Sequence, residues 1–278
     1  MTIYGYGAAI AALGLCATPV LAQEQVAAAA AQQDDVDAEG GVSGFFAIGP
    51  GATPKYDGAK GYDIIPFAVM DVNWKNIAFE LRGLRARADV LGDSRWQAGP
   101  VANLRFKRDS DKDGDGRVKL LDDVGTAIEV GGFVGYRFGG DQTGLGALTV
   151  DLTALKDVKD GHEGATAQVQ ASYGAYRSRR LFVNVDTQAS YGDAKYMRAY
   201  FGVTPVEALR SGMPAYRPKG GLSDVGAGVT FGYQFSERWG LLGRLAADYY
   251  VGDAKDSPIV KDGSKVQGLA GLALSYRF

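Results

Sequence analysis

The chain has 278 residues, with 30 lysines and arginines against 32 aspartates and glutamates and a formal net charge of −2. This near balance provides no basic stripe for phosphate recognition, so no nucleic acid is expected as a partner. Glycine (40 residues) and tyrosine (15 residues) are abundant, whereas histidine and cysteine occur once each. Such a composition is typical of outer-membrane β-barrels, although many soluble β proteins share it.

Residues 8–22 form an apolar stretch, which is shorter than the roughly 20 residues that a membrane-spanning helix needs. The stretch ends in Val20, Leu21 and Ala22, a small-x-small pattern. We therefore predict a signal peptide over residues 1–22, cleaved after Ala22, and a flexible periplasmic lead-in over residues 23–42. A lipoprotein leader ending at Cys16 is the alternative, but Leu15 stands where that signal requires a small residue.

The first strands are predicted at about residues 43–50, 62–72, 76–83 and 94–106, where apolar and polar residues alternate. The alternation changes phase near Gly83: Phe79 and Leu81 are in step, whereas Leu84 and Ala86 are out of step. A phase change of this kind predicts a bulge or a turn at Gly83.

The connection 107–124 contains an acidic segment that is similar to the start of a calcium-binding loop. Three aspartates at alternate positions precede Gly116, and a fourth stands at loop position 12; the candidate ligands are Asp111, Asp113, Asp115 and Asp122. The flanks are predicted strands rather than helices, and lysines offset the charge, which favours an ordinary acidic surface loop. Calcium is the one cofactor that the sequence offers, and the length of the connection favours the outer side of a barrel.

Further strands are predicted at about residues 125–138, 144–155, 164–177 and 180–191, and residues 180–202 fit either one long strand or two. The sole histidine, His162, lies in a glycine-containing turn, with no serine beside it in a recognisable catalytic motif. We interpret it as an exposed loop residue, and we expect no catalytic residue and no enzymatic activity.

The alternation is clearest near the end of the chain. Between residues 224 and 235 one face is apolar and the other is small or polar; the apolar face carries Val225, Ala227, Val229, Phe231, Tyr233 and Phe235. Two more segments repeat this pattern as far as Phe278. No window after residue 40 has the 3.6-residue period of an amphipathic helix.

The predicted strands are about 11–14 residues long, whereas globular strands average about 5–6 and tilted membrane strands need about 9–11. We predict an all-β fold over residues 43–278, a closed antiparallel transmembrane β-barrel. We favour twelve strands, because single-chain bacterial barrels are even-numbered. A secreted soluble β protein is the alternative. Charges on the inner faces are expected to pair with one another rather than to line a substrate path; they are Glu80, Arg82, Arg85, Arg87, Glu129, Arg137, Asp151, Asp186, Arg244 and Asp248.

The chain ends in Tyr276, Arg277 and Phe278, which resembles the aromatic C-terminal signal that the barrel-assembly machinery reads. We therefore expect this machinery as a partner during biogenesis, and lipid of a Gram-negative outer membrane around the barrel. Both termini are then periplasmic, as is the tight turn at Ser236 and Glu237. The long connections 203–221 and 251–265 are expected outside.

Three segments and the terminal strand together resemble the MipA/OmpV family of outer-membrane proteins. The match covers residues 43–278, and its positions include Pro54, Tyr56, Gly58, Tyr200, Phe201, Gly202, Val203, Asp256, Ser257, Pro258, Tyr276 and Phe278. The resemblance implies a barrel without enzymatic activity. The best-known member is described as a scaffold that interacts with the lytic transglycosylase MltA and bridges it to a murein synthase.

The resemblance thus implies a lytic transglycosylase and a murein synthase as partners. Other members of the family are described as adhesins, as osmotically regulated porin-like proteins or as antigens. A narrow porin-like channel and a surface adhesin therefore stay open as alternative functions.

Overall fold

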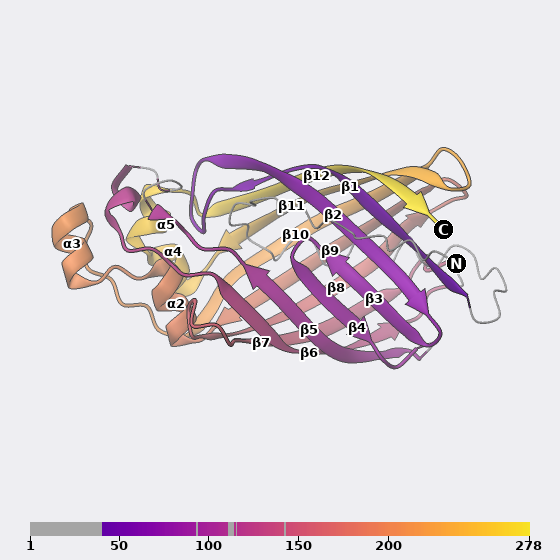
Figure 1. The fold of residues 1–278 in the computed structure, drawn as a ribbon, viewed down its shortest axis with the longest axis horizontal. Helices are drawn as coiled ribbons and strands as arrows, with labels where there is room; N and C mark the ends of the chain where they lie inside the picture. The colour runs from indigo at the N-terminus through magenta and orange to yellow at the C-terminus, as the bar shows by residue number, and fades with distance from the viewer. Residues whose placement is uncertain (1–40, 93, 111–113, 115, 142) are drawn as a thin grey trace, which may run out of the picture.

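The computed structural model describes residues 41–278 except 93, 111–113, 115 and 142. The predicted signal peptide and nearly all of the predicted lead-in lie outside the described residues. The described chain forms a closed barrel in which each strand pairs with its neighbour in sequence and β1 pairs with β12 (Figure 1). The prediction of a closed, twelve-stranded antiparallel barrel is confirmed.

The strands follow the alternating segments of the sequence closely. They are β1 (Val42–Pro54), β2 (Tyr62–Trp74), β3 (Ile77–Arg82), β4 (Arg85–Asp89), β5 (Trp96–Arg105), β6 (Ala127–Phe138), β7 (Leu148–Asp157), β8 (Ala165–Arg177), β9 (Leu181–Gly192), β10 (Gly221–Gln234), β11 (Trp239–Tyr250) and β12 (Val266–Arg277). On β10, Val225 and Tyr233 point outward and are exposed, whereas Thr230 points inward and is fully buried. Period-two alternation therefore separates the outer surface from the lumen.

The predicted phase change at Gly83 is a tight turn between β3 and β4, and Gly83 has the positive φ of 57° that favours glycine. The β3–β4 hairpin is short, so it covers only the half of β2 that lies toward the termini. Among the described residues no strand pairing joins β2 to β5 beyond this hairpin. Ala68 accepts the last hydrogen bond, from Gly83, and Pro66 stands next on the same edge of β2 without an N–H to donate.

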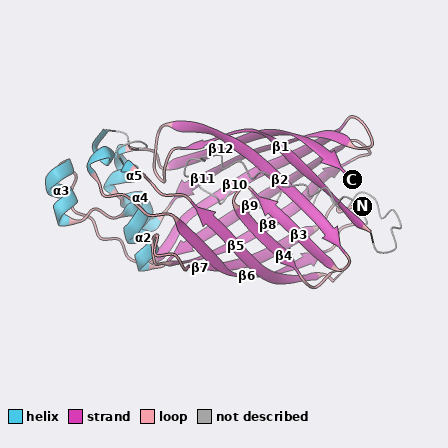
Figure 2. Ribbon diagram, viewed as in Figure 1, coloured by secondary structure: helices cyan, strands magenta, loops and turns pink. Residues whose placement is uncertain are grey.

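All the described helices gather at one end of the barrel, and the start of β1 and the C-terminus lie at the other (Figure 2). They are η3 (Gly116–Leu120), α2 (Ala194–Phe201), α3 (Pro205–Ser211), α4 (Gly252–Asp256) and α5 (Pro258–Asp262). We call this end the helix end and the other the terminus end. The connections 107–124, 203–221 and 251–265 all belong to the helix end.

The interpretation of residues 180–202 as one long strand or two was wrong, because β9 ends at Gly192 and residues 194–201 form a helix. Local capping explains both principal helices. The side chain of Asp193 accepts hydrogen bonds from the backbone N–H groups of Lys195 and Tyr196 at the start of α2. Thr204 and Glu207 form a reciprocal capping box around Pro205 at the start of α3. Helices of two turns are too short to show a 3.6-residue period in a sliding window.

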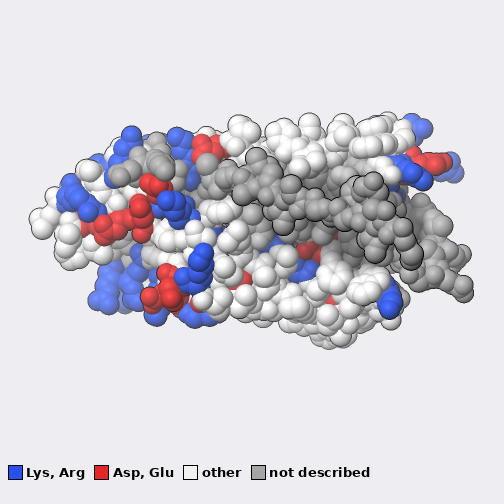
Figure 3. Space-filling model, in the orientation of Figure 1, with Lys and Arg blue, Asp and Glu red and all other residues white. Residues whose placement is uncertain are grey.

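On the face shown in Figure 3, charged side chains gather at the two ends of the barrel, and a belt of mostly uncharged residues lies between them, with a few charged atoms showing at its middle. Exposed aromatic side chains mark both borders of this belt: Tyr62, Tyr191 and Tyr249 toward the helix end, and Trp74, Trp96, Phe138 and Trp239 toward the terminus end. Aromatic girdles around an apolar belt are the arrangement that a lipid bilayer favours. Among the described residues, no helix combines the length and the apolar character needed to span a bilayer.

Candidate functional site

The lumen contains buried ion pairs, and one of them joins β11 to β9. The two guanidinium nitrogens Nη1 and Nη2 of Arg244 each lie 2.9 Å from a carboxylate oxygen of Asp186. Nη1 also donates to the hydroxyl of Thr230 on β10, at 2.9 Å. All three side chains are buried. A two-pronged pair of this kind fixes the lumen walls relative to one another.

A chain of hydrogen bonds crosses the lumen from β4 to β11. Arg85 donates to Gln168 on β8, Gln168 donates to Gln188 on β9, and Gln188 donates to Asp248. The three donor–acceptor distances are 3.0, 2.9 and 2.7 Å. Because β4 and β8 are four strands apart in the barrel, the bond from Arg85 spans the interior rather than running along the wall.

A third group of charges lies inside β2, β3 and β4. Glu80 accepts hydrogen bonds from Arg82 at 3.0 Å and from Arg87 at 2.7 Å, and Arg82 also lies 3.6 Å from Asp71. The predicted lumen charges thus face the interior and largely pair with one another, as expected. Arg137 differs, because it lies at the terminus end of β6, eight residues from Glu129.

His162 closes the lumen at the helix end, so its interpretation as an exposed loop residue was wrong. It is buried, and its Nε2 lies 2.9 Å from Oε1 of Glu129 on β6. Nδ1 accepts a hydrogen bond from the N–H of Gly164 at 3.0 Å, so we assign the ring proton to Nε2, which donates to Glu129.

The carboxylate of Asp157 explains why the histidine turns inward. It accepts hydrogen bonds from the backbone N–H groups of Lys159, His162 and Glu163. These bonds curl the β7–β8 connection over the mouth of the lumen. This placement depends on the fold of the loop, because nothing in the local sequence marks the histidine as buried.

Two tyrosines of α2 cover the histidine. The ring of Tyr196 meets His162 edge-on at 5.2 Å, and that of Tyr200 lies 5.7 Å away. The guanidinium of Arg105 lies over both tyrosine rings, at 5.4 and 5.2 Å. Burial raises the pKa of both tyrosine hydroxyls even beside Arg105, so both hydroxyls stay protonated. We call α2, with its side chains Tyr196 and Tyr200, the lid.

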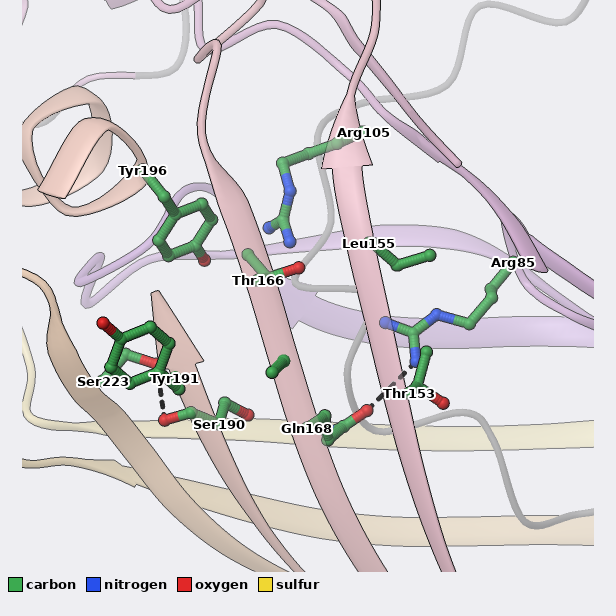
Figure 4. A pocket seen from close by; sticks show the side chains of 11 residues that line it. Arg85, Arg105, Thr153, Leu155, Thr166, Gln168, Ser190, Tyr191, Tyr196 and Ser223 are labelled. Carbon is green, nitrogen blue, oxygen red and sulfur yellow. Dashed lines mark hydrogen bonds between the residues drawn. The ribbon is translucent and has the colours of Figure 1, made fainter. Parts of the chain in front are cut away.

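A small cavity lies directly under the lid, with room for about one water molecule. In Figure 4, Tyr196 and Arg105 lie above it, and the guanidinium of Arg85 reaches the side chain of Gln168. The hydroxyl of Thr153 also lines the cavity and is buried without a hydrogen-bond partner in the described part of the chain. A cavity this small holds solvent, not an organic substrate.

A buried apolar cluster lies in the terminus-end half of the lumen, which the sequence did not predict. Inward side chains of the first, second, ninth, eleventh and twelfth strands form one buried cluster; they are Phe45, Ala47, Phe67, Val69, Phe182, Leu242 and Ala273. This hydrophobic floor lies beside the charged group of β2, β3 and β4, because Phe45 stands opposite Asp71 in the register of β1 and β2. Both ends of the interior are filled by side chains of this chain.

The segments that carried the family resemblance meet at the helix end, although they are far apart in sequence. Ser257 donates from its hydroxyl to the carbonyl of Phe201 at 2.8 Å, which joins the middle segment to the last. Tyr56 and Val203 share a buried cluster with Ile259. Gly58, with a φ of 93°, packs against Val260 and donates to Gln267. The residues that carry the family resemblance therefore pack around the lid.

The remaining positions of the resemblance divide between the two ends. Pro54 ends β1 at the helix end, Gly202 ends α2, and Asp256 and Pro258 belong to α4 and α5. Tyr276 lies at the terminus end and packs edge-on against Trp239 at 4.8 Å. Phe278 exchanges backbone hydrogen bonds with Gly44, which closes the barrel.

Three of the four candidate calcium ligands, Asp111, Asp113 and Asp115, lie outside the described residues. The fourth, Asp122, accepts a hydrogen bond from Arg210 at 2.7 Å. Among the described residues, no group of three or more acidic, histidine or cysteine side chains is placed to hold a metal ion. Calcium binding by this loop stays a prediction.

A family model described as "MltA-interacting protein MipA" matches residues 46–278. The chain belongs to the MipA family. It is 25% identical over 239 residues to the MltA-interacting proteins of Escherichia coli K12 and Shigella flexneri, which covers 84% of this chain and 91% of each relative. The predicted membership of this family is confirmed, and no enzyme family is indicated.

Solved structures with a similar arrangement include two barrels from bacterial outer membranes. The COG4313 outer-membrane channel of Pseudomonas putida F1 is 12% identical, with a TM-score of 0.45, covering 88% of this chain and 100% of that one. The NanC porin is 9% identical, with a TM-score of 0.42, covering 86% of this chain and 100% of that one.

Proposed function

We propose that this MipA-family chain is a non-catalytic outer-membrane barrel that binds a lytic transglycosylase of the MltA type and holds it near a murein synthase. The single observation that carries this proposal is that the lumen is filled at both ends. The lid and His162 close the helix end, and the apolar cluster around Phe45 and Phe182 closes the terminus end. A barrel whose lumen is filled in this way acts by binding other proteins on its outer surfaces.

Two features argue against a passive channel as the principal function. Buried pairs such as Arg244 with Asp186 occupy the centre of the lumen, and breaking one of them would leave an uncompensated charge. Passage at the helix end would also require the lid to leave its cluster with Tyr250 and Val260. The narrow porin-like alternative therefore needs a large rearrangement, and scaffolding needs none.

The orientation forms part of the proposal. The aromatic C-terminus supports insertion by the barrel-assembly machinery with both termini toward the periplasm. The helix end would then face outward and the terminus end would face the murein layer. A surface adhesin would use the helix end, whereas a transglycosylase scaffold would use the terminus end.

Affinity purification of the tagged chain from cross-linked, detergent-solubilised membranes tests this function. We expect recovery of an MltA-type transglycosylase and of a murein synthase, at levels well above those obtained with an unrelated outer-membrane barrel of similar abundance. Recovery of the assembly machinery alone would refute the scaffold.

Liposome swelling with small sugars and amino acids tests the channel alternative with the same preparation. We expect tight liposomes, because both ends of the lumen are filled. Rapid solute flux through the intact protein would favour the channel and contradict the filled lumen as a resting state.

A further inference from the structure

The barrel wall is incomplete beside β2, because β3 and β4 are much shorter than the other strands (Figure 1). The hairpin pairs with β2 only between Val69 and Trp74. From Tyr62 to Phe67, β2 pairs with β1 along one edge, and no described strand pairs with it along the other. We call this unpaired edge of residues 62–67 the open edge.

The register shows which backbone groups face the open edge. Ala68 accepts a hydrogen bond from the N–H of Gly83 at 2.9 Å, so its carbonyl points toward the hairpin side of β2. Alternate residues of a strand direct their backbone groups to the same edge, so those of Tyr62, Ile64 and Pro66 point the same way. Ile64 therefore offers an N–H to the open edge, whereas Pro66, which lies farther from the helix end, has none.

The side chains around the open edge are apolar. Ile64 is 77% exposed, and Pro66 is exposed as well. On the other side, Leu84 in the hairpin turn and Leu104 on β5 are half-buried, and the N–H of Leu104 donates to the carbonyl of Leu84 at 3.1 Å. The open edge is thus part of the apolar belt that faces lipid.

Two lysines stand where the open edge meets the aromatic border of the belt. Lys55 directly follows β1, and Lys60 stands two residues before β2. The backbone N–H of Lys55 donates to the carbonyl of Gly61 at 3.1 Å, which holds both lysines beside the start of β2. Lys60 is exposed and Lys55 half-buried, and neither forms an ion pair with another residue that the structure describes.

The neighbouring acidic residues do not neutralise these lysines. Asp57 points into the barrel, where the hydroxyl of Tyr250 donates to it at 3.1 Å and the guanidinium of Arg105 lies 3.9 Å away. Asp63 is directed inward by the alternation of β2. The two lysines therefore make this part of the border basic.

The depth of each backbone group matches one part of a lipid molecule. Lipid tails offer no hydrogen-bond partner to a backbone N–H, so an unpaired donor within the tails is costly. Ile64 stands only two residues from Tyr62 at the border, where the ester carbonyl of a lipid can accept its hydrogen bond. Pro66 lies among the tails, and it has no N–H that needs a partner.

An added peptide strand is the competing occupant of the open edge, and Pro66 argues against it. A strand that paired with β2 would find no donor at this position, and prolines on edge strands discourage such pairing. The position of the edge within the apolar belt also favours a lipid.

We propose that the open edge binds one membrane lipid with an anionic phosphate head group. The phosphate pairs with Lys55 and Lys60, an ester carbonyl accepts from the N–H of Ile64, and an acyl chain lies against Pro66 and Leu84. This site goes beyond the proposed function, because it concerns a ligand of the wall and not a periplasmic partner. It also does not depend on which end of the barrel faces outward.

Native mass spectrometry of the full chain tests the proposal, after release from nanodiscs that contain equal amounts of phosphatidylglycerol and phosphatidylcholine. We expect one phosphatidylglycerol to be retained per barrel. The double variant Lys55→Gln, Lys60→Gln should retain it at least about fivefold less, because lysines attract anionic lipid. The matched control Lys159→Gln, Lys219→Gln, with exposed lysines elsewhere at the helix end, should stay within about twofold of the parent.

Photo-crosslinking locates the retained lipid on the wall. A phosphatidylglycerol with a diazirine in one acyl chain should label the peptides that contain Ile64 and Leu84 more strongly than the peptide that contains Val225, an outward residue of β10. Labelling that is uniform around the barrel would show only freely exchanging lipid and would overturn the proposal.

Competition separates a lipid from its parts. Excess glycerol phosphate should not displace the phosphatidylglycerol, and diacylglycerol should not replace it, because the site uses both the head group and the chain. Displacement by glycerol phosphate would reduce the site to anion binding by the lysines and overturn the proposal. A heat-dependent shift in gel mobility confirms that each variant forms a barrel.

The remaining outcomes are equally clear. Undiminished retention by the lysine variant, or equal retention of phosphatidylcholine, would refute the head-group site. Retention of a peptide or of a second chain in place of lipid would show that the open edge takes a strand. Recovery of a transglycosylase is measured separately, so failure of the lipid site and failure of the scaffold are distinguishable.

Discussion

Arg244 on β11 reaches across β10 to Asp186 on β9 and pairs with it through both guanidinium nitrogens at 2.9 Å. The strand between them carries Gly228 at the crossing point. A Cβ at this position would lie 2.8 Å from Nη2 of Arg244 and 2.9 Å from Oδ2 of Asp186. The absence of a side chain on β10 is therefore a condition for the pair.

Arg244→Met should destabilise the barrel by about 3–5 kcal/mol, because Asp186 would keep a buried charge without its partner. Urea unfolding in detergent micelles, followed by tryptophan fluorescence, measures the loss. Arg238→Met in the exposed β10–β11 turn is the matched control and should change stability by less than about 0.5 kcal/mol. Equal stability of parent and Arg244→Met would show that the pair contributes nothing.

Gly228→Leu should separate the same two side chains and lower stability by a similar amount. If it acts through the pair, its effect must not add to that of Arg244→Met, because residues that share one contact show coupling of about 0.5–3 kcal/mol. A double-mutant cycle under the same urea conditions tests this. If the two losses of stability were fully additive, Gly228→Leu would act on other contacts of β10 and not on the pair.

His162→Ala should loosen the lid without unfolding the barrel. The variant loses the hydrogen bond to Glu129 and the ring contacts with Tyr196 and Tyr200, which we expect to cost about 1–3 kcal/mol locally. Hydrogen–deuterium exchange by mass spectrometry should therefore show α2 exchanging at least about fivefold faster, with strand peptides unchanged. Lys159→Ala, in the same loop with an exposed side chain, should leave α2 as protected as in the parent.

The exposed pair of Glu163 and Lys195 ties the β7–β8 connection to the start of α2, with 2.9 Å between Oε2 and Nζ. The hydrogen bond from Lys195 lowers the pKa of Glu163, and Glu163 raises the pKa of Lys195. The stabilisation of the folded state by Glu163 is present above its ordinary pKa of 4.5, and it is lost as the pH falls through its lowered pKa. That of Lys195 is present below 10.5 and is lost as the pH rises through its raised pKa.

A carboxyl-carbon NMR titration of Glu163 measures the direction of its pKa shift directly. The midpoint should lie below 4.5 in the parent and move up toward 4.5 in Lys195→Met. High salt should move it the same way, because exposed charges are screened. A midpoint that ignores both changes would contradict the pairing.

Calcium binding by the acidic connection can be tested through thermal stability. If Asp111, Asp113 and Asp115 hold the ion, millimolar calcium should raise the thermal midpoint of the lid, and the double variant Asp113→Ala, Asp115→Ala should abolish the increase. Magnesium serves as the control ion. A parent whose midpoint does not respond to calcium would end the hypothesis.

The strands and the inner face of the wall could be predicted because both follow from a period of two. That period reports which side of a sheet a residue occupies, and it placed Glu80, Glu129 and Arg244 inside the lumen. It does not report which inward residues meet across the lumen. The hydrophobic floor, in which Phe45 meets Phe182 from the ninth strand, depends on closure and was therefore missed.

The helix end could be predicted only in part, because its contacts are made between connections. The capping box of Thr204 and Glu207 was a usable local signal for α3. The burial of His162 had no local signal, since it results from the hydrogen bonds of Asp157 and from the packing of α2. Loop residues of this kind are located by tertiary contacts and not by sequence spacing.

The short β3–β4 hairpin gives the cylinder a seam. The terminus-end half of β2 is held by neighbours along both edges, whereas its helix-end half is held by β1 along one edge only. Pro66 stands on the open edge, where a residue with an N–H would offer an unsatisfied donor. Under a pulling force, or during extraction from the bilayer, the wall should part first along this seam, while the remaining interstrand ladders hold.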